Sequence, residues 1–129
     1  SGPPQELPEK TVSRELGRWG EEQTASFLRQ RGWRIQAAGW QCRFGELDLV
    51  AENGEFLAFV EVKLRKNANF AQAREFVTPS KQRKLRAAAE LYLMKYPTRM
   101  QPRFDVAEVY ASQGVDTLNP VIRIWENAF

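Results

Sequence analysis

Three acids and a lysine lie close together in one short stretch of the sequence, at Glu46, Asp48, Glu61 and Lys63. The residues around them are mostly apolar, which is typical of strands that are covered on both faces. Two like charges about 5 Å apart repel by roughly 3 kcal/mol at an effective dielectric constant of about 20. A bound divalent cation would offset the excess of negative charge, so the stretch predicts a metal site.

The same stretch is predicted to form a β-hairpin. The pair Asn53-Gly54 favours a two-residue type I′ turn, because both residues accept the positive φ that this turn requires. Glu52 then pairs with Glu55, and the four charged side chains project from one face because side chains alternate along a strand. Asp48 and Glu61 become diagonal neighbours with Cα atoms roughly 7–8 Å apart. Two carboxylates at that separation can share one cation.

Composition narrows the chemistry further. The chain has 129 residues, no histidine and one cysteine, Cys42. The absence of histidine excludes Ser-His-Asp and Cys-His catalysis and every zinc site that needs histidine. A single cysteine excludes an internal disulfide and suits a reducing compartment, so we expect a cytoplasmic protein; no apolar run approaches the length of a membrane span. Carboxylates, lysine and a hard cation such as Mg²⁺ or Mn²⁺ remain for catalysis.

Positive charge is concentrated in one part of the chain. The net charge is +3, but residues 64–86 carry seven bases and one acid, or +6, and the remainder carries −3. A basic block that follows an acidic cluster suits a polyanion held beside a metal, although a solvated helix face explains the block equally well on its own. The bases are Arg65, Lys66, Arg74, Lys81, Arg83, Lys84 and Arg86.

The elements that must position these residues are predicted in the order α-β-β-β-α-β-β. Residues 1–12 are rich in proline and predicted to be a flexible tail, and residues 13–129 a single domain. Ser13 is expected to cap the first helix, which ends before Gly32; Thr78 and Pro79 begin the second, which runs to about Tyr96. Strands are predicted at 33–37, 46–51, 56–64, 103–110 and 121–125. An irregular segment at 40–44 is expected to lead into the hairpin, and a long loop is expected at 67–77. This order is typical of a mixed α/β sheet flanked by helices.

Taken in order, the motifs resemble the PD-(D/E)xK nuclease superfamily, which has a restriction-endonuclease-like αβββαβ core. They read Gly17-Arg-Trp-Gly-Glu21, then Gly45-Glu-Leu-Asp48, then Val60-Glu-Val-Lys63, then Lys81-Gln82. Within that superfamily the sequence is similar to the YraN-like family of small bacterial proteins and to archaeal Holliday junction resolvases. The resemblance covers residues 13–125. One departure is that Leu47 stands before Asp48, where many members have proline.

The resemblance implies a Mg²⁺- or Mn²⁺-dependent endonuclease and gives a role to each matching position. Asp48 and Glu61 would be metal ligands, helped by the backbone carbonyl of Val62. Glu21 would assist the metal from the first helix. Lys63 would orient or activate the attacking water, which also agrees with its place two residues after Glu61, on the same face of the strand.

The resemblance also places Gln82 in the second helix, near the cation or the scissile phosphate. The implied partner is DNA, branched or single-stranded, bound with the help of the basic block. Two alternatives stay open: a nucleic-acid-binding module with a silent nuclease site, and a protein-interaction domain that presents the basic helix to an acidic partner. Symmetric substrates favour paired sites, so a homodimer would suit the nuclease interpretation.

Overall fold

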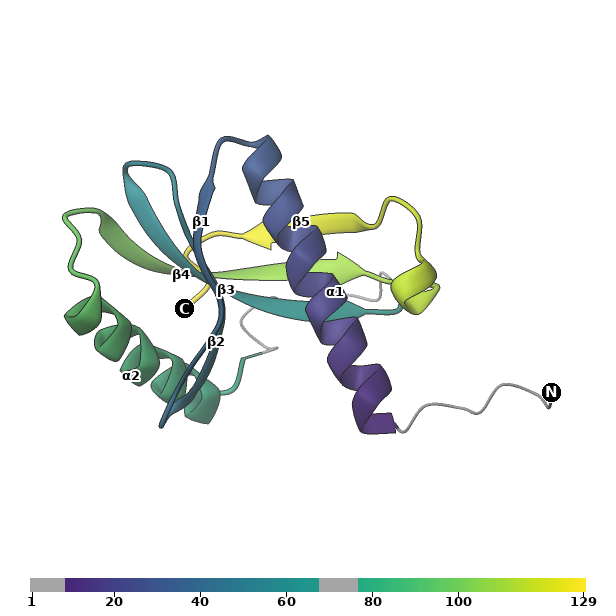
Figure 1. Ribbon diagram of the computed structural model, residues 1–129, viewed down its shortest axis with the longest axis horizontal. Coiled ribbons are helices and arrows are strands. Elements are labelled where there is room, and N and C mark those ends of the chain that lie inside the picture. Colours follow the sequence, from purple (N-terminus) through teal and green to yellow (C-terminus); the bar gives the residue numbers. More distant parts are fainter. Residues whose placement is uncertain (1–8, 68–76) are drawn as a thin grey trace.

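The protein is described from a computed structural model, which places residues 9–67 and 77–129, with side chains from Ser13 onward. Its elements are α1 (Glu9–Gln30), β1 (Arg34–Cys42), β2 (Gly45–Glu52), β3 (Phe56–Arg65), α2 (Pro79–Lys95), β4 (Gln101–Tyr110), the 3₁₀ turn η2 (Gly114–Asp116) and β5 (Val121–Trp125). The predicted order and the mixed α/β class are confirmed, including the αβββαβ core (Figure 1).

The five strands form one sheet in the order β1-β2-β3-β4-β5. Only β3 and β4 are parallel among the four adjacent pairs, and α2 lies between them in the chain. A parallel pair needs such a crossover, because a short turn can join only antiparallel neighbours. Across the described ranges, 9–67 and 77–129, no helix is long and apolar enough to cross a membrane.

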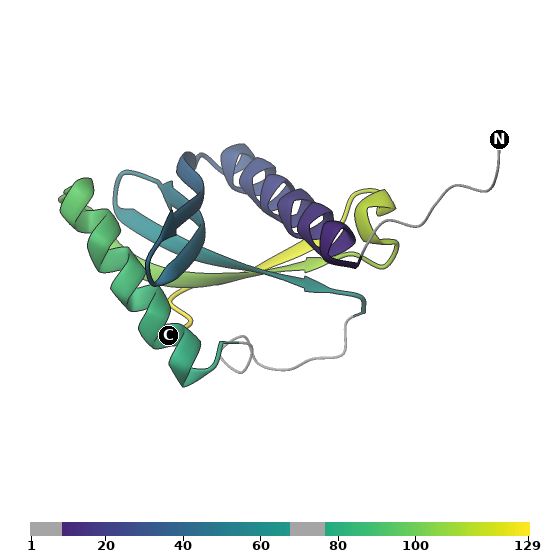
Figure 2. The ribbon, with the colours of Figure 1, turned by 60° about the horizontal axis from the view of Figure 1, so that its bottom comes forward.

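The two helices cover opposite faces of the sheet (Figure 2). On one face, Ala25 and Leu28 of α1 pack against residues of β2 and β3 that include Val60. On the other, Leu85 and Tyr92 of α2 pack against the opposite side of the sheet. This arrangement explains why β3 is apolar at successive positions and confirms that it is covered on both sides.

The first helix begins earlier than its sequence signals indicate. α1 starts at Glu9, so Ser13 lies inside the helix, and its prediction as the N-cap is wrong. The other end agrees with expectation: Gly32 has φ +86°, and the amides of Gly32 and Trp33 donate to the carbonyls of Arg29 and Leu28. This is the Schellman arrangement, in which a left-handed glycine satisfies the last carbonyls of a helix.

The first strand is longer than predicted. The segment expected to be irregular continues β1 as far as Cys42, pairing Trp40 with Leu47 and Cys42 with Gly45. A register shift between Ile35 and Ala37 interrupts the alternation, which is why the period-two pattern stops near residue 37. β5 has the predicted bounds, and Thr78 is confirmed as the N-cap of α2.

The β2–β3 connection is a longer loop than the predicted type I′ turn. Glu52 pairs with Leu57 rather than with Glu55, and Asn53 is not among the described residues of positive φ. The side-chain Oδ1 of Asn53 instead accepts hydrogen bonds from the amides of Glu55 at 3.0 Å and Phe56 at 2.8 Å. Asparagine therefore acts here through its side chain rather than through a left-handed backbone. The register therefore moves by two residues.

The alternation of β2 is also interrupted around Asp48, because Leu47 packs with α2 and Leu49 with α1. The prediction that all four charged side chains share one face is therefore wrong: Glu46 and Asp48 line a groove beside α1, whereas Glu61 lies beside Lys81 of α2.

Replacing Asn53 with alanine should lower the free energy of unfolding by about 1 kcal/mol, because two loop amides lose their acceptor in an exposed position. Urea denaturation of the two proteins measures the change. Asn53→Asp retains the acceptor and is the matched control, expected within about 0.5 kcal/mol of wild type. Equal midpoints for wild type and Asn53→Ala would contradict the loop mechanism.

Candidate metal site and active site

The acids gather where two neighbouring strands separate. Backbone pairing between β2 and β3 runs from Glu52 and Leu57 to Leu49 and Val60, while the start of β2 remains paired with β1. Beyond Val60, the amide of Val62 donates instead to the side chain of Asp48, at 2.8 Å from Oδ2. The N–H and C=O of one strand residue point toward the same neighbour. The Val62 carbonyl therefore faces the same gap between the strands.

Glu61 lies on β3 beside this gap. Leu49 and Val60 are the last backbone pair between the two strands, so Asp48 and Glu61 both stand where the strands separate, and the register behind their predicted diagonal relation is not the one observed. Glu61 is only 7% exposed, and its Oε2 lies 3.8 Å from the ammonium of Lys81 on α2. The structure thus brings Asp48 and Glu61 together, with a positive charge from the second helix beside them.

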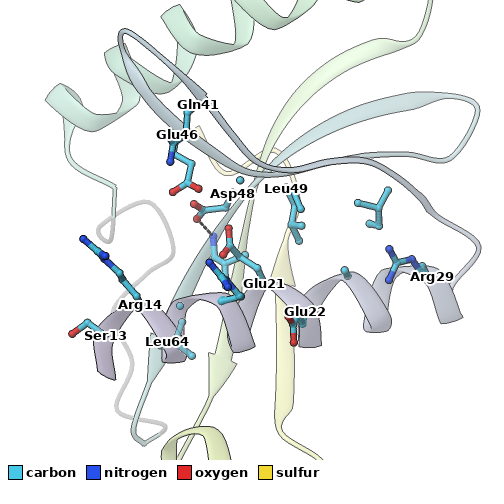
Figure 3. Close-up of a pocket in the computed structure, with 17 residues that line it drawn as sticks. Ser13, Arg14, Glu21, Glu22, Arg29, Gln41, Glu46, Asp48, Leu49 and Leu64 are labelled. Carbon is cyan, nitrogen blue, oxygen red and sulfur yellow. Dashed lines mark hydrogen bonds between the residues drawn. The ribbon is translucent and has the colours of Figure 1, made fainter. Parts of the chain in front are cut away.

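The first helix adds a third acid because it packs very close to β3. Gly20 is buried, and a Cβ atom there would lie 2.8 Å from Leu64 Cδ2 and 3.4 Å from Val62 Cγ1. This close approach carries Glu21 to the gap. Figure 3 shows the Glu21 carboxylate, from α1, near the carboxylate of Asp48, from β2.

Glu46 is the fourth acid of the cluster. With Glu21 and Asp48 it lines a groove of about 840 Å³ between α1 and the first two strands (Figure 3). Its Oε1 lies over Gly39, where an added Cβ would be 2.9 Å away. Gly39 therefore leaves room for this carboxylate above β1, a role that the sequence pattern did not indicate.

Crowding of the carboxylates has a clear electrostatic effect. The pKa of Asp48 is raised to about 8, first by burial and then by its hydrogen bond with Glu61 and the repulsion between the two carboxylates. Burial and the nearby charges of Asp48 and Glu46 raise the pKa of Glu21 to about 7. The pKa of Glu46 is also raised, by burial and by Asp48. Each acid therefore needs a proton or a cation to be stable beside the others.

The chemistry of these donors fits a hard divalent cation. Glu21 Oε1 and Glu61 Oε2 are buried and have no hydrogen-bond partner in the described structure. The Lys81 ammonium forms an ion pair with Glu61 Oε2, but their separation of 3.8 Å is too long for a hydrogen bond. Carboxylate and carbonyl oxygens are the ligands that Mg²⁺ prefers. Among residues 9–67 and 77–129, no three acids already stand in coordinating positions, so a cation here would take two carboxylates with the Val62 carbonyl and water.

Lys63 and Gln82, the two remaining predicted catalytic residues, lie on different elements and have different surroundings. Lys63 is half-buried on β3, two residues after Glu61 and in register with Glu108 of β4. Gln82 lies in the first turn of α2, where its side-chain amide donates to the carbonyl of Val77 at 2.9 Å. Gln82 is therefore engaged in fixing the start of the helix.

The predicted basic block divides into three groups. Arg65 lies 3.9 Å from the buried Glu108, and Arg86 lies over the rings of Phe104 and Phe129, so these two arginines contact the folded core. Lys81 lies beside the acids. Lys66, Arg83 and Lys84 are exposed, as is Arg86 despite its ring contacts, and Arg74 falls outside the described residues.

Arginines at the rim of the groove were not predicted. Arg14, Arg18 and Arg29, all on α1, line it together with the acids. The positive charge of Arg18 also lowers the pKa of Glu21, against the larger upward effects. The spacing of Arg14, Arg18 and Glu21 at i, i+4 and i+7 places them on one helix face, and this signal could have identified the two arginines from sequence.

Comparison with known proteins gives one consistent result. Residues 20–109 match the family described as "Uncharacterised protein family UPF0102". A UPF0102 protein from Syntrophomonas wolfei is 42% identical over 120 residues, covering 92% of this chain and 100% of the relative. A relative from Caldicellulosiruptor saccharolyticus is 38% identical over 117 residues, covering 90% of this chain and 98% of the relative. A relative from Nocardia farcinica is 44% identical over 100 residues, covering 77% of this chain and 79% of the relative.

The family match spans every acid of the cluster, from Glu21 to Glu61, and continues through Lys63 and Lys81. The resemblance to YraN-like proteins, seen first in these motifs, is therefore confirmed at the level of the family. This chain belongs to the UPF0102 family.

Proposed function

We propose that this protein is a Mg²⁺- or Mn²⁺-dependent endonuclease that hydrolyses phosphodiester bonds in DNA. The observation that carries the proposal is the pair of buried carboxylate oxygens of Glu21 and Glu61 that have no hydrogen-bond partner in the described structure, on two acids that both interact with Asp48. A structural ion pair needs one acid and one base, and the additional acids here only add repulsion. Acids kept buried against such repulsion are typical of functional sites.

The residues can be assigned roles from their positions. Asp48 and Glu61 would hold the cation with the Val62 carbonyl, and Glu21 would support it from α1. A divalent cation bound there supplies Lewis acidity and makes a water molecule nucleophilic at neutral pH. Lys63, on the same face of β3 as Glu61, would orient that water or accept its proton.

The surroundings of the acids favour a polyanionic substrate. Arg14, Arg18 and Arg29 line the groove that the acids also line, and exposed bases of α2 add positive charge. Basic side chains along a groove attract a phosphodiester backbone and hold it in register. A single strand can bend into a groove of about 840 Å³ more easily than a stiff duplex can, which favours single-stranded or branched DNA.

The test is a panel of linear duplex, single-stranded, flapped and four-way DNA, each incubated with Mg²⁺, Mn²⁺ or EDTA. We expect cleavage of at least one substrate, dependent on the metal and lost in Glu61→Ala. Glu55→Gln removes an acid at the exposed hairpin loop and should cleave like wild type. Salt-dependent binding without cleavage would instead indicate a silent site, and no binding at low salt would favour the protein-interaction alternative.

A further inference from the structure

Lys81 occupies an unusual position for a residue of a basic helix. Its ammonium lies 3.8 Å from the buried Oε2 of Glu61, although 43% of its own side chain is exposed. Its charge also lowers the pKa of Asp48 and of Glu46, partly offsetting the mutual repulsion of the acids. One ammonium therefore acts on three carboxylates of the cluster. This is the electrostatic role that a bound cation would also fill.

The backbone of Lys81 is held in the helix cap, whereas its side chain is partly exposed to solvent. Its amide donates to the Thr78 side chain in the N-terminal cap of α2, and Leu85, one turn later, is buried against the sheet. The ammonium stands at the end of a flexible four-carbon stem that reaches solvent. The side chain can therefore leave Glu61 without any movement of the helix.

A divalent cation and this ammonium compete for the same oxygen. Glu61 Oε2 lies 3.8 Å from the Lys81 ammonium, and it is also one of the two buried oxygens that lack a hydrogen-bond partner in the described structure. Two positive charges within a few ångströms repel strongly where water is scarce. A cation that binds Glu61 therefore displaces the ammonium, which remains tethered at the edge of the acidic cluster.

We propose that Lys81 is the resident counter-ion of Glu61, that a divalent cation displaces it, and that the released ammonium then holds a phosphate of the bound DNA. The inference rests on the proposed function, because it assumes a cation site at Glu61. It assigns to Lys81 a positioning role that couples metal binding to substrate binding. Without metal, Lys81 stabilises the acids; with metal, it becomes available to the substrate.

The first experiment measures Mg²⁺ affinity by titration calorimetry at pH 8. Lys81→Met and Lys81→Gln both remove the competing charge and should bind Mg²⁺ about three- to tenfold more tightly than wild type. Lys84→Met, an exposed lysine one turn along the same helix, is the matched control and should bind like wild type. The increase in melting temperature on adding Mg²⁺ should also be larger for the Lys81 variants, and this comparison holds even if they fold less stably.

The outcomes separate the two proposals. Unchanged Mg²⁺ affinity in both Lys81 variants, with measurable binding in wild type, would overturn the counter-ion role and leave the nuclease proposal standing. No Mg²⁺ binding in wild type or in either variant would overturn the cation site itself. Weaker binding in the Lys81 variants would also overturn displacement, because it would make Lys81 a support for the metal rather than its competitor.

The second experiment tests the phosphate contact with a fluorescent single-stranded oligonucleotide, in EDTA and in Ca²⁺, with a gel confirming that the probe stays intact. Lys81→Met should weaken DNA binding about threefold more in Ca²⁺ than in EDTA, because the ammonium is free only when a cation holds Glu61. Lys84→Met should have the same effect in both conditions. Equal effects of Lys81→Met in the two conditions would overturn the coupling between metal and substrate.

Discussion

Asp48→Asn is expected to reduce metal-dependent cleavage by about 10²–10³-fold while leaving the fold intact. Asparagine has nearly the same shape, and its Oδ1 can still accept the hydrogen bond from the Val62 amide, which Asp48 accepts at 2.8 Å. It carries no negative charge, however, so it is a poor ligand for a hard cation. Cleavage rates in Mg²⁺, measured beside circular dichroism spectra, separate lost chemistry from lost structure.

The same substitution should change how stability depends on pH. In the metal-free folded protein the pKa of Asp48 is about 8, against a value of 3.8 for an unperturbed aspartate. The folded state therefore binds more protons than the unfolded state between these values, and the resulting stability is present below about pH 4 and lost as the pH rises through 8. The pKa of Glu21, raised from 4.5 to about 7, acts with the same sign.

We therefore expect the melting temperature of the wild-type protein in EDTA to fall between pH 5 and pH 9, and that of Asp48→Asn to fall less. Mg²⁺ should restore more stability to wild type at high pH, because the metal binds the deprotonated carboxylates. Glu55→Gln, at the exposed loop, should follow the wild-type curve. Parallel curves for wild type and Asp48→Asn would show that Asp48 titrates as an ordinary surface acid.

The parts of the fold that could be predicted from sequence depend on local signals. Thr78-Pro79 and Gly32 determine helix ends through capping and backbone geometry within a few residues. The apolar run of β3 reflects burial on both faces, because α1 covers one face of the sheet and α2 the other. The start of α1 was predicted too late, because Ser13 is a residue type that favours the N-cap although it lies inside the helix. A local signal therefore predicts that an element exists better than it predicts where it begins.

The candidate site was predictable only in part, because its geometry depends on distant contacts. The spacing of Asp48, Glu61 and Lys63 identified the acidic cluster, but the register depends on a side-chain hydrogen bond of Asn53 that the Asn-Gly pair does not reveal. The basic block likewise did not distinguish Lys81, beside Glu61, from Arg86, which packs on aromatic rings. Charge counts along the chain cannot show which bases fold against the acids.

Gly20→Val is expected to lower the free energy of unfolding by about 1–3 kcal/mol, the usual cost of overpacking a buried contact. Its first added carbon would lie 2.8 Å from Leu64 Cδ2 and 3.4 Å from Val62 Cγ1, and the branched side chain needs still more room. Gly17→Val, three residues earlier in the same helix, is the matched control, because nothing lies within 4 Å of its added carbon. Its expected change is within about 0.5 kcal/mol of zero.

Urea denaturation of the two variants compares the same substitution in the same helix, so helix propensity cancels and only the contact with β3 differs. Relief of the overlap would move α1 away from β3 and carry Glu21 away from the gap beside Val62. Folded Gly20→Val should therefore also bind Mg²⁺ more weakly than Gly17→Val does. Gly20→Ala should be milder, because the methyl ends of Leu64 can rotate away from a single added carbon. Equal losses of stability at positions 17 and 20 would mean that the close approach of the helix does not position this acid.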